Sequence, residues 1–246
     1  TNTTADNNTA VGYYALRLNT TGSSNTASGN YALYSNTTGG QNVALGESAL
    51  QNNTTASGGT ALGWASLWSN TTGANNAAVG HSALEVNTTG GQNTAIGDHA
   101  LNTNTTGSYN AGLSRYALFA NTTGGNNTAI GHQSLAANTT ASNNVAVGYQ
   151  SLYTNTEGAS NVSVGYRSLY QNTTGAANGA FGYQTLFSNT TGADNVAVGT
   201  NALYNNLTGA NNAAVGQGAL NSNTTGSDNT AIGKNSSYSN TTGAIN

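Results

Sequence analysis

The chain has 246 residues, of which only 4% are charged, and its formal net charge is -3. Proteins that bind nucleic acids carry clusters of basic residues to neutralise phosphates, and four Lys plus Arg residues cannot supply such a surface. No apolar run approaches the roughly 18 residues needed to cross a bilayer. We therefore expect no nucleic-acid partner and no membrane span in this segment.

A 17-residue repeat runs through the whole sequence. A row of glycines with this spacing extends from Gly12 to Gly233 and is broken only by Ser114. Fourteen full copies fill residues 8–245 without insertion or deletion, and partial copies flank them. A unit of this size cannot bury a core alone, so each copy must stack on its neighbours. The sequence predicts a single continuous solenoid over residues 1–246, as part of a longer array.

Each copy opens with a segment that is predicted to be a short β-strand, Asn8–Val11 in the first copy. Gly12 would end the strand with a bend that favours a residue without Cβ. Equal positions of successive copies would then lie about 4.7–4.8 Å apart. The chain contains no proline, which would remove an N–H group from such backbone ladders. The predicted fold class is a β-rich parallel β-solenoid or β-roll with one coil per repeat.

The next segment, residues 13–18 of the first copy, has two interpretations. From Gly12 to Asn19, the nearly constant positions follow i, i+3, i+4, i+7 spacing, which favours one or two helical turns. The alternative is a strand with one face inside the coil and the other against a second chain. We favour the helical turn. The Asn-Thr-Thr-Gly segment that follows would close the coil, with Gly22 free to take a positive φ.

Stacking equal positions produces two apolar columns. One contains Val11 and its equivalents and is broken only by Ser28, and the other contains Leu16 and its equivalents. The positions of Ala10 and Ala15 hold almost only small residues. This restriction indicates that other groups pack closely against them.

One row of the repeat is Asn in every copy. From the first full repeat onward its members are Asn19, Asn36, Asn53, Asn70, Asn87, Asn104, Asn121, Asn138, Asn155, Asn172, Asn189, Asn206, Asn223 and Asn240. Most of them lie in N-x-[ST] glycosylation sequons. The alternative is a ladder of stacked side-chain amides that hydrogen-bond along the column. Because glycans about 4.8 Å apart would be severely crowded, we favour a ladder of inward-facing side chains.

Charged residues also stack in the column of residue 13. The column contains His81, Asp98, Arg115 and His132. Glu85 lies four residues after His81, and the third histidine of the chain, His99, lies outside the column. One interpretation is a metal site or an acid–base pair. The other is a solvated charge ladder, which we favour because the same column holds Tyr, Trp and Asn elsewhere. We therefore expect no catalytic residues, no metal, no cofactor and no enzyme activity.

Thirteen of the 18 aromatic residues fall in the columns of residues 13 and 17. On consecutive coils these columns hold Tyr149, Tyr153, Tyr166, Tyr170, Tyr183, Phe187 and Tyr204. One interpretation is a contact face for sugars, for another fibre or for a second subunit. The other is that stacked rings only shield the edges of the coils. Both interpretations remain open at this point.

The run Asn-Thr-Ala-Ile-Gly at residues 93–97 resembles the head repeats of trimeric autotransporter adhesins. The longer segments NTAIGHQSLAANTT (127–140) and NNVAVGYQSLYTNTEG (143–158) are similar to arrays in tail-fibre-type and adhesin-like proteins. The resemblance implies a left-handed parallel β-roll, three chains side by side and an extracellular place on a cell or virion surface. The adhesin head repeats are shorter than 17 residues, so each coil here would have an extra segment.

The function that we favour is a structural one, a segment of an extracellular fibre or stalk that self-associates as a homotrimer or filament. The alternative is an adhesin-type binding module that recognises surface glycans or sister fibres through its aromatic residues. An ice-binding solenoid is a third interpretation, because columns of Thr can order water. Thr20 and Thr21 are adjacent, however, so only one of them would face outward from an extended segment.

Overall fold

The computed structural model describes residues 4–243. The chain divides into two compact units, Thr1–Gly125 and Asn126–Asn246, and each unit is described by itself. Within the described residues all regular secondary structure consists of three-residue strands joined by turns, and no helix is present. Accordingly, this part of the chain has no helix of the length and apolar character that crossing a membrane requires.

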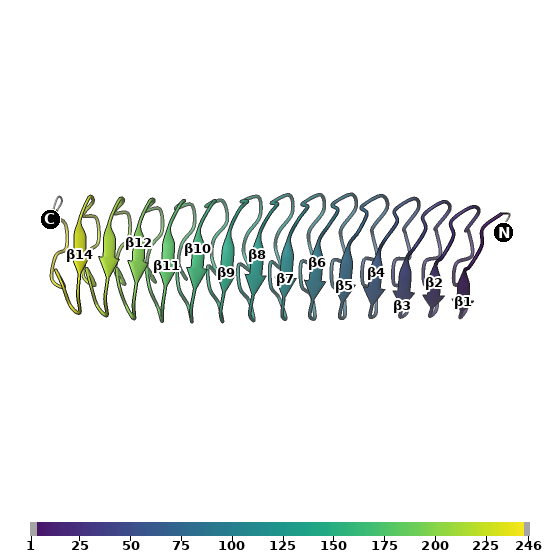
Figure 1. Ribbon diagram of the computed structural model, residues 1–246, viewed down its shortest axis with the longest axis horizontal. Coiled ribbons are helices and arrows are strands. Elements are labelled where there is room, and N and C mark those ends of the chain that lie inside the picture. Colours follow the sequence, from purple (N-terminus) through teal and green to yellow (C-terminus); the bar gives the residue numbers. More distant parts are fainter. Residues whose placement is uncertain (1–3, 244–246) are drawn as a thin grey trace. The chain divides into compact units, whose positions relative to one another are not determined.

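Each unit is a parallel β-solenoid with one strand per repeat. In the first unit the strands are β1 (Thr9–Val11), β2 (Thr26–Ser28), β3 (Val43–Leu45), β4 (Thr60–Leu62), β5 (Ala77–Val79), β6 (Thr94–Ile96) and β7 (Ala111–Leu113). In the second unit they are β8 (Thr128–Ile130), β9 (Val145–Val147), β10 (Val162–Val164), β11 (Gly179–Phe181), β12 (Val196–Val198), β13 (Ala213–Val215) and β14 (Thr230–Ile232). Within each unit the strands follow one another in chain order (Figure 1).

Consecutive strands within a unit pair in parallel, and the paired residues are 17 positions apart. Thr60 of β4, for example, pairs with Ala77 of β5. The predicted fold class, with one coil per 17-residue repeat, is therefore confirmed. Each strand starts one residue later than predicted, because Asn8 and its equivalents lie outside it.

The strands end at the row of glycines, as predicted. Gly12 has a φ of 126°, and a Cβ added to it would lie 2.6 Å from the carbonyl oxygen of Gly29 in the next coil. Both the backbone conformation and the close approach of the coils therefore favour glycine here. Ser114, which is the single non-glycine residue of the row, has the same φ of 126°.

The prediction of a helical turn after the strand is wrong, and so is the strand alternative. Tyr14 and Leu16 have φ values of 57° and 53°, and an α-helix of L-residues requires a negative φ throughout. The segment forms turns in which some N–H groups donate to adjacent coils and others donate within the coil. Leu33 N–H, for example, donates to the carbonyl oxygen of Ala49 at 2.9 Å. Asn36 N–H, by contrast, donates to the carbonyl oxygen of Leu33 in its own coil at 3.4 Å, so the stacked turns divide their backbone bonds between the coil and its neighbours.

The apolar core lies inside the coils and is thin. The two small positions of each repeat point inward, as Ala44 and Ala49 show, and both are fully buried. The row of Leu16 supplies the largest fully buried side chains, from Leu33 in the first unit to Leu220 in the second. The predicted close packing at the small positions and the predicted leucine column are both confirmed.

The other apolar column lies on the outer face of the strands. Val11 is 61% exposed and Ile96 is 45% exposed. Successive residues of a strand point to opposite faces. Because the middle residue of each three-residue strand points inward, the first and third residues point outward. Each unit therefore presents an outer sheet face with exposed aliphatic side chains.

The predicted asparagine ladder is present in both units. The side-chain amide of Asn36 donates to Oδ1 of Asn19 at 2.8 Å and to the carbonyl oxygen of Gly39, also at 2.8 Å. The same pattern continues to Asn121 in the first unit. Because these side chains are buried and their NH₂ groups are occupied, the row is built into the coil rather than presented as an acceptor for glycans.

In the second unit the ladder runs from Asn138 to Asn223. Asn240 was predicted to belong to it, but its amide donates to the carbonyl oxygen of Gly243 at 3.2 Å. Oδ1 of Asn223 accepts no hydrogen bond in the described part of the chain. The ladder therefore ends one coil earlier than the sequence row predicts.

The prediction of a positive φ at Gly22 is wrong, because this residue lies outside the left-handed region. A Cβ added at Gly22 would lie 2.7 Å from Oδ1 of Asn19 and 2.8 Å from Nδ2 of Asn36. The same Cβ would first collide with the backbone carbonyl oxygen of Gly39 in the next coil, so the stacked backbone and the asparagine ladder together keep this row small. Positive φ values occur instead at the turn residues Ser24, Tyr14 and Leu16.

A second buried asparagine column was not predicted. Oδ1 of Asn8 accepts a hydrogen bond from the backbone N–H of Asn25 at 2.9 Å, and Oδ1 of Asn25 accepts one from Asn42 N–H at 3.0 Å. Nδ2 of Asn25 donates to the carbonyl oxygen of Gly39, which also accepts from Asn36 of the first ladder. The two columns therefore share acceptors. The Asn8 row is Asn in every copy except at Gly59, and this near-constancy was the available signal, although the sequence predicted that Asn8 belongs to the strand.

Gly59 interrupts this second column, and we expect Gly59→Asn to stabilise the first unit by about 1 kcal/mol. The new Oδ1 would accept from Asn76 N–H, as Oδ1 of Asn42 now accepts from Gly59 N–H at 2.8 Å. Gly59 is outside the left-handed region, so the side chain introduces no backbone strain. Thermal unfolding measures the gain. Gly59→Ala is the matched control, because it adds the same Cβ without an accepting oxygen, and an equal gain from both variants would contradict the hydrogen-bonding explanation.

Candidate functional site

Two stacks of aromatic rings lie on the second unit. In the first stack the ring centroids of Tyr149 and Tyr166 are 5.4 Å apart and those of Tyr166 and Tyr183 are 5.2 Å apart, with interplanar angles of 11° and 7°. The second stack comprises Tyr153, Tyr170, Phe187 and Tyr204, with successive centroids 5.3, 5.2 and 5.1 Å apart. All seven predicted contact-face residues are therefore brought into the two stacks.

A polar column lies close to both stacks. The guanidinium carbon of Arg167 is 5.3 Å from the ring centroids of both Tyr166 and Tyr170. Its Nε donates to Oε1 of Gln150 at 2.9 Å, and Nε2 of Gln150 donates to Oε1 of Gln133 at 2.8 Å. The rings and these side chains form one strip, which we call the aromatic strip.

The stacking determines which ring surfaces a partner can reach. Tyr183 is 50% exposed, yet its ring lies nearly parallel to that of Tyr166. Neighbouring rings thus cover part of one another's faces within each stack, whereas the end rings Tyr183 and Tyr204 are followed by Thr200 and Asn221 rather than by another ring. Sugars that stack on aromatic residues use the ring face, so the rings inside the stacks offer them less surface than the end rings do.

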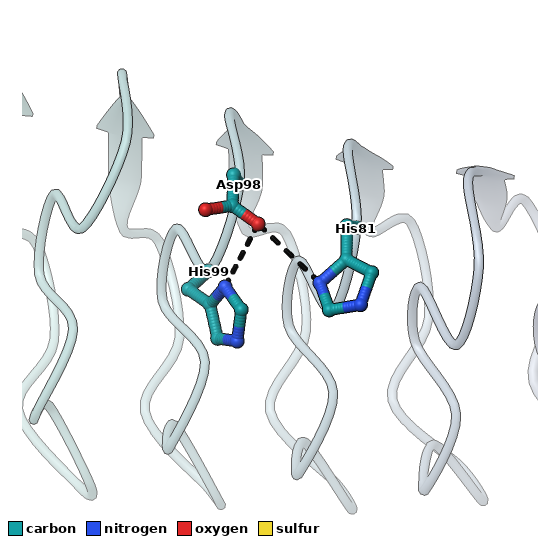
Figure 2. A group of neighbouring side chains, drawn as sticks. All are labelled: His81, Asp98 and His99. Carbon is teal, nitrogen blue, oxygen red and sulfur yellow. Dashed lines mark hydrogen bonds and ion pairs between the residues drawn. The ribbon is translucent and has the colours of Figure 1, made fainter.

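The first unit contains a cluster of His81, Asp98 and His99 (Figure 2). Nδ1 of His81 lies 3.3 Å from Oδ1 of Asp98, and Nδ1 of His99 lies 2.9 Å from the same oxygen. Nε of Arg115 donates to the other carboxylate oxygen, Oδ2, at 3.0 Å. The side chains come from two adjacent coils, since His81 and Asp98 occupy equal positions of the repeat.

The structure confirms only part of the predicted charged column. Asp98 contacts both His81 and Arg115, as the column predicts. Glu85 does not join them, because its Oε2 accepts a hydrogen bond from Asn102 at 3.0 Å. His132 belongs to the second unit, where its ring stacks on Tyr149 with centroids 5.6 Å apart.

His99 is the member of the cluster that the sequence analysis missed. It lies one position beyond the column, where a regular strand would point it to the opposite face. The turn after the strand instead gives His99 a φ of 55° and brings its ring to the carboxylate of Asp98. The position of His99 directly after Asp98 in the sequence was the available signal for this contact.

The carboxylate of Asp98 is held in its ionised form. Partial burial acts to raise the pKa of Asp98, but the hydrogen bonds with His99 and Arg115 outweigh it and keep that pKa below its ordinary value. The hydrogen bond with Asp98 in turn raises the pKa of Arg115. Asp98 therefore presents a negative charge to the two imidazole rings at neutral pH.

Comparisons with family models, with curated proteins and with solved structures found no match to this chain. The resemblance to the head repeats of trimeric autotransporter adhesins and to tail-fibre-type arrays therefore stays a prediction from the sequence.

Proposed function

We propose that this chain is a structural segment of an extracellular fibre or stalk at a cell or virion surface. The observation that supports the proposal is the recurrence of the same bonds between consecutive coils throughout each unit. A parallel strand pair, an asparagine bond and a threonine bond join neighbouring coils. Oγ1 of Thr20, for example, donates to the carbonyl oxygen of Thr37 at 2.9 Å. These bonds recur along each unit, except that Leu207 has no hydroxyl and the asparagine ladder ends at Asn223. Coils joined in this repeating way can be added without changing the fold, so the number of coils sets the length of the segment.

We further propose that the fibre forms by self-association, as a homotrimer or filament. The outer sheet face supports this part of the proposal, because no charged residue stands at either outward position of the strands. Exposed aliphatic side chains such as Ile96 and Val198 lie on it. Contiguous apolar surface of this kind marks interfaces between proteins.

Electron microscopy of the purified chain tests the structural function. The comparison is with a variant in which the seven repeats of the second unit are duplicated. We expect the particle to lengthen by about 4.8 Å per added coil at constant cross-section, which also counts the chains. A particle whose length does not increase with the number of coils would refute the proposed role.

The alternative function is an adhesin-type module, and the half-exposed rings of the aromatic strip favour it. Changing Tyr166, Tyr170 and Tyr183 together to Ser should leave the fold intact, because Thr200 and Asn221 already occupy the same columns. If the strip is an adhesive face, binding to glycans, surfaces or sister fibres should weaken by at least about tenfold, or 1.4 kcal/mol.

Binding assays and thermal unfolding of this triple variant separate the two functions. Tyr109→Ser is the control, since Tyr109 is an exposed ring of the first unit outside the strip. Unchanged binding would exclude the adhesin-type function of the strip and leave the structural function as the remaining one. A large loss of stability would instead mean that the rings are part of the core.

A further inference from the structure

We propose that His81, Asp98 and His99 form a binding site for one divalent transition-metal ion, with Zn²⁺ as the reference ion. The site is independent of the proposed fibre function. It also differs from the sequence-based expectation of no metal, which placed these residues in a solvated charge ladder. The structure adds His99 to the two residues of that column and directs all three side chains toward one point (Figure 2).

The spacing of the donor atoms fits a tetrahedral ion. Zn²⁺ binds imidazole nitrogen and carboxylate oxygen at about 2.0–2.2 Å, which places neighbouring ligand atoms of a tetrahedron about 3.3–3.5 Å apart. Nδ1 of His81 and Nδ1 of His99 lie 3.3 and 2.9 Å from Oδ1 of Asp98. All three donor atoms lie within 4.8 Å of one another. Small side-chain rotations are therefore enough to bring them to bonding distance.

Neighbouring side chains hold the ligands in place. The ring of His81 stacks on Trp64 with centroids 4.9 Å apart, and the ring of His99 lies 5.4 Å from that of Tyr116. Arg115 occupies Oδ2 of Asp98, which leaves Oδ1 facing the two imidazoles. Such contacts limit the orientations that the ligand side chains adopt.

The donor set selects among ions. Two imidazole nitrogens and one carboxylate oxygen suit Zn²⁺, Cu²⁺ and Ni²⁺, whereas Mg²⁺ and Ca²⁺ prefer oxygen ligands alone. The metal would bind at Nδ1 of each ring, with the ring proton on Nε2. The side chain of His81 is 52% exposed, so water can reach the ion and complete its coordination.

Binding would tie two adjacent coils together. His81 belongs to one coil, and Asp98 and His99 belong to the next, so the ion adds a bridge parallel to the strand pair between β5 and β6. A ligand that binds the folded state alone raises stability in proportion to the logarithm of its concentration. Zn²⁺ should therefore raise the unfolding midpoint of the chain.

Isothermal titration of the tag-free chain with ZnCl₂ near neutral pH tests the site. We expect one ion per chain, and more than tenfold weaker binding in His81→Thr and in His99→Ala, because removing a ligand costs more than removing a supporting residue. The repeat itself holds Thr200 and Ala65 at these two positions, so both variants should fold. His132→Thr is the matched control, with the same substitution at the same repeat position, and it should bind as the unchanged chain does.

Zinc-edge X-ray absorption gives a second readout, with two nitrogen ligands expected at about 2.0–2.1 Å in the unchanged chain. Mg²⁺ titrated in place of Zn²⁺ should give no comparable heat. The proposal is overturned if the unchanged chain does not bind Zn²⁺. It is also overturned if His132→Thr weakens binding as much as His81→Thr does, or if binding survives in both cluster variants.

Discussion

Leu152→Ala is expected to lower the free energy of unfolding of the second unit by about 2–5 kcal/mol. Leu152 is fully buried, and the Leu row supplies the large apolar side chains of the core, while the other inward apolar positions hold small residues. Loss of this side chain leaves a cavity that the rigid stack of coils cannot close. The expected loss therefore contains both the transfer free energy and the cavity contribution.

Chemical denaturation of Leu152→Ala beside Val147→Ala measures this effect. Both substitutions remove aliphatic groups from the same coil, but Val147 points to the outer face of β9 and is only partly buried. We expect Val147→Ala to cost less than about 1 kcal/mol. Equal losses from the two variants would mean that the leucine column is not the core of the coil.

The repeat made much of this fold predictable from the sequence. Because no residue is inserted or lost, the alignment of the copies gives the register of the sheet directly, as the pairing of Thr60 with Ala77 confirms. The constancy of the Asn19 row likewise predicted a hydrogen-bonding column inside the coil. Both predictions succeeded because they depend only on equal positions lying above one another.

The prediction failed where the path of the chain within one coil decides the structure. The i, i+3, i+4, i+7 spacing of the constant positions from Gly12 to Asn19 predicted a helical turn, but Leu16 and its equivalents adopt a left-handed φ. Their N–H groups donate to the adjacent coils, an option that a periodicity argument within one copy does not consider. The prediction at Gly22 failed for a related reason, since the backbone of the next coil and the neighbouring ladder, rather than its own φ, require a small residue.

The same limit applies to the candidate sites. The aromatic stacks follow from equal positions, and all seven rings were predicted. The cluster around Asp98 joins residues from two different positions of the repeat, and only the turn conformation of His99 brings them together. Sequence columns therefore predict contacts between equal positions and miss contacts between neighbouring columns.

The asparagine ladder leads to the prediction with the largest electrostatic effect. Asn104→Asp is expected to destabilise the first unit by more than about 3 kcal/mol at neutral pH. Nδ2 of Asn104 donates to Oδ1 of Asn87 at 2.8 Å and to the carbonyl oxygen of Gly107 at 2.9 Å. A carboxylate loses both donated bonds and places a buried charge beside two acceptor oxygens. Asn104→Ala, which adds no charge, should cost about 1–3 kcal/mol.

The effect of Asn104→Asp should depend on pH. Burial and the two facing acceptors raise the pKa of the introduced carboxyl in the folded chain above its unfolded value of about 3.9. The penalty is therefore complete above the folded pKa and shrinks as the pH falls through that pKa toward the unfolded one. Protonation also restores one donor. Urea unfolding at neutral pH and near pH 4 measures the difference.

Thr106→Asp provides the control for Asn104→Asp, because Thr106 is exposed and Glu157 stands at the equivalent position of another coil. It should change stability by less than about 0.5 kcal/mol at either pH. If Asn104→Asp is equally mild, or if acid does not reduce its cost relative to the unchanged chain, the side chain of Asn104 is not enclosed. In that case the invariant asparagines would need an explanation other than the ladder. If the cost appears and acid reduces it, exclusion of a buried charge explains why Asp never replaces Asn in this row of the repeat.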